Sequence, residues 1–256
     1  MTAAMDHART YWEYQYRVAR EHMAPLLERW GVTLAGCSLL DVGCGSGGGT
    51  CAMADLGVRC TGYDVNSRLI DEANALKGER TVVFSAADLY RDEPPEAGTY
   101  DLVVLHDVFE HLDRKDEMME KLRRAMRPDG RLLITFPPYY SAYGAHQQHL
   151  RAPFARLPFF HLLPFAISWI VPSLRNEHPY VIDEVTKLGR HRMGMRKFEA
   201  IARRTGMTIV GKEAYVVSPN HIRFGLKPLP AGPLAEVPVL GEIVCTGVVY
   251  LLSGKP

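Results

Sequence analysis

The sequence predicts an α/β fold, in which buried strands alternate with helices around a mainly parallel sheet. One observation is the stretch 38–50, where a short apolar run ends in an acid and leads through a glycine-dense turn into a helical pattern. The other is that apolar or β-branched runs recur at 58–64, 81–89, 100–106 and 131–136. Such runs, with helical patterns between most of them, are typical of parallel strands covered on both faces.

Length and composition narrow the classes of protein. The 256 residues have room for one α/β domain with an insertion, and 47% apolar and 23% charged residues are ordinary for a globular protein. The net charge of +1 does not favour nucleic acid as a partner. Five cysteines without C-x-x-C spacing, and an N-terminus without an apolar signal core, predict reduced thiols and a cytoplasmic protein.

The first element is an amphipathic helix over residues 8–30 with many aromatic residues near its start. Its spacing predicts that it packs on the edge of the sheet with most of its aromatic rings in the core.

The glycine-dense turn has the pattern of a ligand-binding loop between a strand and a helix. Gly43 and Gly45, followed by Gly48, satisfy the dinucleotide fingerprint G-x-G-x-x-G, and the same pair followed by Gly47 satisfies G-x-G-x-G. Glycine is required where a Cβ atom would block the turn or the approach of a ligand. Asp41 ends the strand, where dinucleotide folds usually carry an apolar residue, and its carboxylate suits a ligand with an ammonium group.

This stretch resembles the first motif, D/E-x-G-x-G-x-G, of the class I S-adenosylmethionine (SAM)-dependent methyltransferases. The segment V-F-E-H-L at 108–112 resembles the fourth motif of that family, and the R-P-D-G turn at 127–130 before an apolar strand also matches it. The resemblance covers residues 38–138. It implies SAM as the cofactor and a Rossmann-like sheet of seven mostly parallel strands, with an antiparallel last strand and helices on both faces.

The resemblance also implies how the cofactor is bound. The leading helix often covers the cofactor, which makes Tyr11 a candidate, with Tyr16 and Arg17 as other options for the methionine carboxylate. Asp64, at the end of strand 58–64, lies where a carboxylate accepts bonds from both ribose hydroxyls, although it could instead cap the helix 67–76. The complete set of predicted cofactor-binding residues is Tyr11, Asp41, Gly43, Gly45, Gly47, Asp64, Val65, Ala87, Asp88, Leu89 and His106.

Asp88 with its two neighbours, and His106, lie at the ends of the next two predicted strands. In the family, Asp88 would lie against the adenine amino group, with Ala87 and Leu89 framing the ring; a plain turn aspartate is the alternative. His106 ends the strand 100–106, at the edge where open α/β sheets bind ligands.

The remaining core elements are a helix at 116–126, ended by R-P-D-G, and the strand 131–136. A helix at 197–206 and strands at 207–217 and 243–252 complete the sheet, with a proline-rich loop at 219–238. We therefore divide the single domain into four parts, which are a helical cover (1–30), a SAM-binding core (31–138), an insertion after strand five (139–195) and the C-terminal part of the sheet (196–256).

The insertion is predicted to be a helical, apolar lid over the substrate. Residues 157–174 contain no Asp, Glu, Lys or Arg, and this length approaches that of a membrane span. Pro158, Pro164 and Pro172 argue against a spanning helix. We favour a buried lid over an interfacial anchor, because no basic face is evident beside the segment to hold anionic lipid.

Methyl transfer is an in-line displacement, which requires positioning and exclusion of water more than a covalent residue. An alcohol or ammonium acceptor must also lose a proton, so the candidate bases are His106, His146 and His149. The candidate substrate-binding residues are Tyr139, Tyr140, Tyr143, Arg190 and Arg192. No metal site is expected, because the H-x-x-H pattern at 146–149 has no carboxylate nearby in the sequence.

The predicted function is methyl transfer from SAM to an O or N atom, less favourably a C atom, of a small and partly apolar acceptor. One alternative is a SAM-binding enzyme that catalyses a rearrangement or cyclisation without methylation. A second is an NAD(P)-dependent oxidoreductase using G-x-G-x-x-G. The expected partners exclude nucleic acid and include a possible peripheral membrane contact or a lipid-linked substrate.

Overall fold

A computed structural model describes residues 3–92 and 97–254, with only the backbone of residues 3–7. Its centre is an eight-stranded sheet with the strand order β3-β2-β1-β4-β5-β8-β6-β7. The strands are β1 (Ser38–Val42), β2 (Arg59–Asp64), β3 (Val83–Ala86), β4 (Tyr100–His106), β5 (Met126–Phe136), β6 (Thr208–Val217), β7 (Leu229–Pro230) and β8 (Gly247–Ser253).

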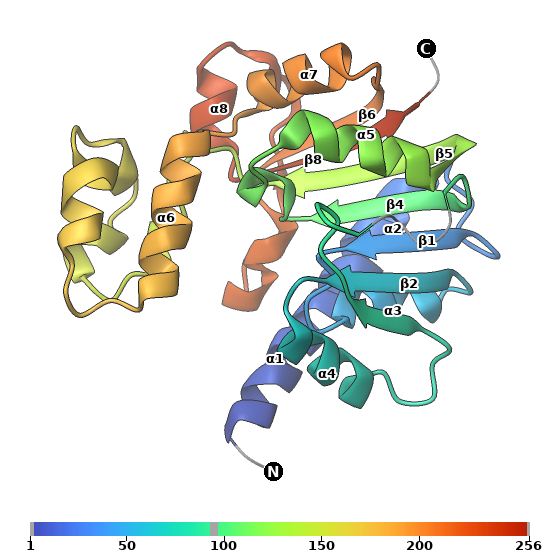
Figure 1. Cartoon of the computed structure of the whole chain (residues 1–256). Coiled ribbons are helices and arrows are strands. Elements are labelled where there is room, and N and C mark those ends of the chain that lie inside the picture. The colour runs from blue at the N-terminus through green and yellow to red at the C-terminus, as the bar shows by residue number, and fades with distance from the viewer. Residues whose placement is uncertain (1–2, 93–96, 255–256) are drawn as a thin grey trace.

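Strands β1 to β5 are parallel, and β8 runs antiparallel between β5 and β6. The order reverses at β1, which pairs with β2 on one side and with β4 on the other. The carboxyl ends of the parallel strands all lie at one edge of the sheet, on the left in Figure 1. Open α/β sheets bind ligands at this edge, beside the point where the strand order reverses.

Helices cover both faces of the sheet (Figure 1). They are α1 (Ala3–Val18), α2 (Ala24–Arg29), α3 (Gly48–Ala54), α4 (Ser67–Leu76), α5 (Lys115–Ala125), α6 (Pro179–His191), α7 (Met195–Arg204) and α8 (Leu240–Val244), and a π-helical turn, Ala19–Met23, joins α1 to α2. Apolar side chains of α5 and α7, including Met118, Leu122 and Phe198, form the core on one face. Those of α2 and α3, including Leu27 and Cys51, belong to the core on the other face.

The predicted sheet is confirmed, with two local differences. The R-P-D-G segment is not a separate turn, because β5 already begins at Met126, which pairs with Tyr100 before a bulge. A bulge tolerates the proline and the glycine within a strand. Near the C-terminus, Leu240–Val244 forms α8, so the last strand begins at Gly247, and the loop at 219–238 contributes the short edge strand β7.

The insertion has a small core of its own beyond the carboxyl ends of the strands (Figure 1). Tyr139, Leu150, Phe160, Val171 and Val185 are buried in this core, and α6 carries the last of them.

The predicted buried lid helix at 157–174 is wrong in two respects. The segment is a chain of short 3₁₀ and π-helical turns, because each of its prolines lacks the N–H that a continuous helix requires. Several of its large apolar side chains are exposed, such as Phe165 at 70% and Trp169 at 72%. Among the described residues, no helix has the length and apolar character needed to cross a membrane.

Candidate cofactor and acceptor site

The glycine loop after β1 has a backbone that residues other than glycine rarely adopt. Gly43, Gly45 and Gly47 have φ angles of +77°, +55° and +82°. A Cβ atom on Gly43 would lie 2.3 Å from a methyl carbon of Val108. On Gly48, in the first turn of α3, it would lie 2.1 Å from a backbone oxygen of α1. Glycine is therefore needed both for the turn and for the close packing of α1 onto the loop.

Asp64, at the end of β2, supports this loop. The Gly45 N–H donates to Asp64 Oδ2 at 3.0 Å, and the Asn66 N–H donates to Asp64 Oδ1 at 2.8 Å. The N-cap of α4 is Asn66, whose side chain accepts from the Arg68 N–H at 3.1 Å. The capping role that the sequence allowed for Asp64 therefore belongs to Asn66, and the Asp64 carboxylate is at the binding edge.

A cleft of about 550 Å³ opens at this edge. Its walls come from α1, the glycine loop, the ends of β2, β3 and β4, and α6. The predicted cofactor-binding residues that line it are Tyr11, Gly43, Gly45, Asp64, Val65, Ala87, Asp88, Leu89 and His106. The sequence prediction missed Tyr14 and Gln15 of α1, which also line the cleft and lie close to Tyr11 on the same helix. Burial raises the pKa of Tyr14, so its hydroxyl remains protonated at neutral pH.

Asp41 and Gly47 are not part of the cleft wall. Asp41 is buried and accepts a 2.6 Å hydrogen bond from the Thr50 hydroxyl, and burial raises its pKa to about 6. It lines a separate cavity of about 30 Å³ beneath the loop, which also touches His106. Gly47 precedes α3, and a Cβ there would lie 2.5 Å from the Phe84 ring. A direct contact of Asp41 with the cofactor ammonium stays a prediction.

Two other residues of α1 also point elsewhere. The Tyr16 hydroxyl donates to Asp55 at 2.9 Å, and Arg17 pairs with Glu21 one helical turn away. Tyr11 is therefore the one member of the three candidates on α1 that lines the cleft.

His106 is held by a hydrogen-bonded chain at the end of β4. Its Nδ1 lies 2.9 Å from Thr135 Oγ1, which donates to Asp107 Oδ1 at 2.7 Å. A carboxylate only accepts, so the Thr135 hydroxyl gives its proton to Asp107 and must accept from His106 Nδ1–H. In the neutral ring this leaves the lone pair on Nε2. Asp107 has a left-handed backbone (φ +54°), which is unusual for a residue other than glycine.

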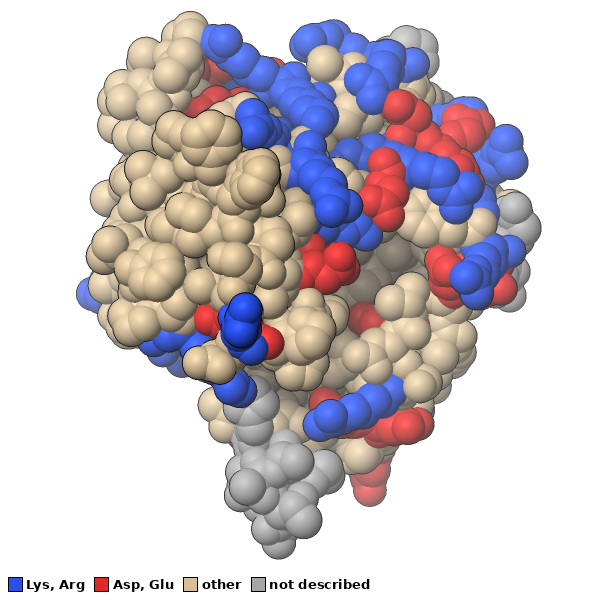
Figure 2. Space-filling view, turned by 60° about the vertical axis from the view of Figure 1, so that its left-hand side comes forward, with Lys and Arg blue, Asp and Glu red and all other residues tan. Residues whose placement is uncertain are grey.

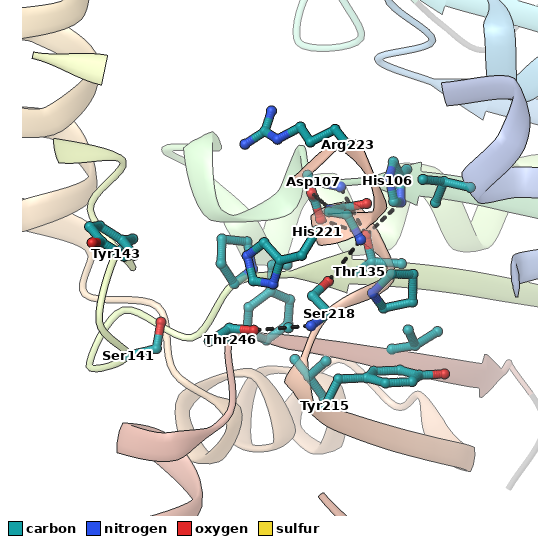
Figure 3. A pocket seen from close by; sticks show the side chains of 18 of the residues that line it. His106, Asp107, Thr135, Ser141, Tyr143, Tyr215, Ser218, His221, Arg223 and Thr246 are labelled. Carbon is teal, nitrogen blue, oxygen red and sulfur yellow. Dashed lines mark hydrogen bonds between the residues drawn. The ribbon is translucent and has the colours of Figure 1, made fainter. Parts of the chain in front are cut away.

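A second cavity, of about 100 Å³, adjoins the same histidine (Figure 3). His106, Asp107 and Thr135 come from the sheet, Ser141, Tyr143 and His146 from the insertion, and Asn220, His221 and Arg223 from the segment after β6. Burial, together with the nearby Arg223, lowers the pKa of His221, which favours its neutral form. His106 and Asp107 both line this cavity and the cofactor cleft, so the two sites meet at these residues at the strand edge.

The other predicted substrate and catalytic residues are spread over the insertion. Tyr139 is buried against His161, Tyr140 and Arg192 line a further cavity of about 400 Å³, and Arg190 is exposed. His149 lies beside His146, with 5.7 Å between ring centroids. Of this group, Tyr143 and His146 share the second cavity with His106. The arginine that lines the second cavity is Arg223, which lies in a segment where the sequence showed no motif.

The order and direction of the strands distinguish a SAM-dependent methyltransferase from an NAD(P)-dependent oxidoreductase. A dinucleotide fold has six parallel strands in the order 3-2-1-4-5-6, whereas here the antiparallel β8 lies between β5 and β6. A profile of the methyltransferase domain family matches residues 40–134. Residues 40–134 therefore match the core of the class I SAM-dependent methyltransferases. The NAD(P)-dependent alternative is set aside, and SAM is the cofactor of this methyltransferase core.

Curated methyltransferases match part of the chain. A phosphoethanolamine N-methyltransferase of Plasmodium falciparum is 33% identical over 101 residues, which is 38% of this chain and 38% of that protein. A malonyl-[acyl-carrier protein] O-methyltransferase of Halalkalibacterium halodurans is 30% identical over 118 residues, 43% of this chain and 44% of that protein. The chain thus spans less than half of the length of these two relatives.

Solved structures resemble the fold over nearly the whole chain. A putative methyltransferase of Haloferax volcanii, solved in complex with the Trm112 activator, has a TM-score of 0.61 at 15% identity, covering 99% of this chain and 95% of its own. Phosphoethanolamine N-methyltransferase 2 of Haemonchus contortus, in complex with SAM, has a TM-score of 0.57 at 16% identity, covering 91% of this chain and 52% of its own. These similarities establish the fold.

The side chains of the methyltransferase cleft fit SAM. Its volume of about 550 Å³ is in the range of small-molecule sites. The glycines leave the loop backbone open to a ligand, Asp64 offers carboxylate oxygens, and Ala87 and Leu89 offer apolar surface on either side of Asp88. Asp64 and Asp88 would hold the hydroxyl and amino groups of the cofactor.

Proposed function

We propose that the protein transfers the methyl group of SAM to an oxygen or nitrogen atom, less favourably a carbon atom, of a small and partly apolar acceptor. The observation that carries the proposal is His106, which lines both the cofactor cleft and the second cavity. Bound SAM supplies an electrophilic methyl group. The protein must place the acceptor atom beside that methyl group and exclude water.

His106 is the candidate general base for an acceptor that loses a proton. The Thr135–Asp107 chain holds Nδ1–H and leaves the Nε2 lone pair as the proton acceptor. Asp107 then stabilises the imidazolium that forms, acting through Thr135. His146 lines the same cavity but contacts Glu184, and it is not part of the hydrogen-bonded chain of His106, Thr135 and Asp107.

The second cavity indicates the chemistry of the acceptor. Phe136, Pro137 and Val248 give it apolar walls, and Ser141 and Tyr143 add hydroxyl groups. Arg223 lies at its margin (Figure 3). Its guanidinium carbon is 4.7 Å from the Phe224 ring centroid. We assign to Arg223 the anion-binding role that the sequence suggested for Arg190 and Arg192. An acceptor with an apolar body and a carboxylate or phosphate fits this lining.

Calorimetry with SAM, and with its demethylated product S-adenosylhomocysteine, tests the cofactor. We expect both to bind, and Asp64→Ala to weaken binding by about tenfold or more, or about 1.4 kcal/mol. Asp71→Ala, on the exposed side of α4, is the matched control and should bind as the wild type. Absence of binding by both ligands would refute the proposal.

Mass spectrometry of a metabolite panel incubated with SAM tests the reaction. A gain of one methyl group in a product supports transfer. Turnover of a metabolite without that gain would favour the alternative of a SAM-dependent rearrangement or cyclisation.

We also propose that the exposed face of the insertion contacts an anionic membrane surface. Phe154, Phe165 and Trp169 are exposed on it, and Figure 2 shows a broad surface free of charged side chains with Lys and Arg at its border. Residues 132–176 contain three arginines and no Asp or Glu. Arg156 and Arg175 are exposed, so a basic margin is present where the sequence suggested none. Apolar side chains with basic neighbours are typical of peripheral membrane contact.

A further inference from the structure

Residues from three parts of the chain form a histidine–glutamate cluster beside the cofactor cleft. Glu110 and His111 follow β4 in a 3₁₀ turn (Phe109–His111), His146 lies in the insertion after β5, and Glu184 is on α6. No carboxylate lies near His146 in the sequence, but in the folded chain Glu184 Oε1 is 3.0 Å from His146 Nδ1. Glu110 Oε1 is 3.7 Å from His111 Nε2.

Glu110 is the feature of this cluster that ordinary packing does not explain. Its side chain is 1% exposed, and neither carboxylate oxygen has a hydrogen-bond partner among the residues that the structure describes. The neighbouring ammonium of Lys115 donates to the backbone carbonyls of Glu110 and Leu112. A buried polar group without a partner costs free energy, so such a carboxylate indicates a missing ligand.

We propose that Glu110, His111 and His146 bind one divalent metal ion. Their candidate ligand atoms lie within 4.8 Å of one another, and two atoms that each lie about 2.1 Å from a metal are at most about 4.2 Å apart. Ligand atoms about 2.1 Å from one tetrahedral ion are about 3.4 Å apart. The Glu110–His111 pair, at 3.7 Å, is near this separation, and His146 would move by up to about 1.4 Å to join it. Glu184 then holds His146 through Nδ1, as carboxylates commonly orient histidine ligands.

The donor set indicates the kind of ion. Two imidazole nitrogens and one carboxylate favour Zn²⁺, Mn²⁺ or Fe²⁺, whereas Mg²⁺ and Ca²⁺ prefer oxygen ligands. His111 lines the cofactor cleft and His146 lines the second cavity. The ion therefore lies between the cofactor cleft and the second cavity. Three protein ligands leave it open coordination positions for water or an acceptor oxygen. Its role in orienting the acceptor rests on the proposed function, but its binding does not.

A second set, His146, His149 and Glu184, also has its ligand atoms within 4.8 Å of one another. It is less suited to the ion, because His149 is exposed and Glu184 already has His146 as a partner. This second set also leaves the buried Glu110 carboxylate without a partner. Separate substitutions of His111 and His149 distinguish the two sets.

The test is calorimetric titration of the full chain, freed of metal by chelator dialysis, with Zn²⁺ and with Mn²⁺, and with Mg²⁺ for comparison. We expect one site per chain. Glu110→Gln, which keeps the shape of the side chain, and His111→Ala should each weaken binding by about a hundredfold. His149→Ala, and the remote control His22→Ala, should bind within about threefold of the wild type. Mn²⁺ paramagnetic resonance gives a second readout of the same affinities.

Three outcomes would overturn the assignment. They are no stoichiometric binding of Zn²⁺ or Mn²⁺, binding unchanged in both Glu110→Gln and His111→Ala, and binding lost in His149→Ala but kept in His111→Ala. Circular dichroism checks the fold of each variant, and either of the first two variants suffices if the other does not fold. SAM binding is measured separately without metal, so failure of the metal site is distinguishable from failure of the proposed function.

Discussion

At the scale of the residue, the orientation of the His106 ring depends on two partners. Thr135 is distant in the sequence, and Asp107 has an unusual backbone. Thr135 comes from the neighbouring strand β5 and pairs with His106 in the sheet register. Asp107 reaches Thr135 because its backbone is left-handed, and Asn220 donates a further hydrogen bond to its carboxylate. Such strain in a residue other than glycine is common at functional sites.

Replacing Thr135 by Val keeps the shape of the side chain and removes the hydroxyl that links His106 to Asp107. We expect kcat for an alcohol or ammonium acceptor to fall by about tenfold to a hundredfold, and His106→Ala to lower it further, by about 10²–10⁴-fold. For Thr135→Val the KM for SAM should change little, because Thr135 does not line the cofactor cleft. Steady-state kinetics with both substrates checks this. Thr50→Val, which removes a hydroxyl bonded to Asp41, is the comparison variant, because Thr50 is not part of the hydrogen-bonded chain His106–Thr135–Asp107. Unchanged kcat in both His106→Ala and Thr135→Val would show that no base acts through this histidine.

Asp41 predicts a pH dependence of stability. Burial raises its pKa from 3.8 to about 6 in the folded protein. The folded state therefore holds this proton more tightly than the unfolded state. The resulting stabilisation is complete below about pH 3.8 and is lost as the pH rises through about 6.

Asp41→Asn should remove this dependence, because the amide oxygen still accepts from Thr50 and carries no charge. Relative to this variant, the free energy of unfolding of the wild type should fall by roughly 2–3 kcal/mol between pH 4 and pH 7. Urea unfolding at several pH values, with Asp71→Asn as the control, provides the measurement. Parallel pH profiles for the wild type and Asp41→Asn would contradict the assignment.

At the scale of the element, residues 153–175 of the insertion support the second cavity without lining the cofactor cleft. Of the described residues in 153–175, none lines either cavity. They instead supply Phe160 and Val171 to the core that holds residues 139–149 in place. This arrangement predicts separate effects on cofactor binding and on turnover.

Deleting residues 153–175 and joining the ends with a short glycine–serine linker should abolish turnover. SAM affinity should stay within roughly tenfold of the wild type, or about 1.4 kcal/mol. Calorimetry with SAM and an assay of methyl transfer measure the two effects, and circular dichroism confirms that the shortened chain is folded. If this folded chain still methylates its acceptor, the insertion is not a lid.

At the scale of the whole molecule, the apolar face of the insertion predicts binding to vesicles. We expect the protein to sediment with vesicles of phosphatidylserine and phosphatidylcholine, and less with phosphatidylcholine alone. Phe165→Ser combined with Trp169→Ser should reduce binding by about tenfold, because two exposed apolar side chains are lost. Val83→Ser combined with Val210→Ser, which changes exposed valines on the sheet, is the matched control.

Two results would count against this membrane contact. One is the absence of vesicle binding by the wild type at low salt. The other is concentration-dependent dimerisation that the Phe165 and Trp169 substitutions abolish, which would assign the face to a second copy of the chain. Fluorescence of Trp169, which is 72% exposed, should shift to shorter wavelength on membrane contact.

Much of the fold and of the cofactor cleft was predictable because the relevant signals are local. Gly43, Gly45 and Asp64 each lie just after, or at the end of, a recognisable strand, and the carboxyl ends of parallel strands meet at one edge. The family resemblance predicted Asp88 at the cofactor site, and the end of its strand predicted His106 at the same edge; both line the cleft.

What only the tertiary structure decided depends on contacts between distant segments. Glu110, His146 and Glu184 meet because the insertion folds back over the strand edge, and no local pattern encodes that path. The choice of Asn66 over Asp64 as the cap was a competition between neighbours with equal propensity. Arg190 and Arg223 are both exposed, but only Arg223 lines the second cavity, because the packing of the segment after β6 places it there. The sequence by itself determined most of the strand-end residues that line the cofactor cleft, and the packing of the insertion and of the segment after β6 determined the second cavity.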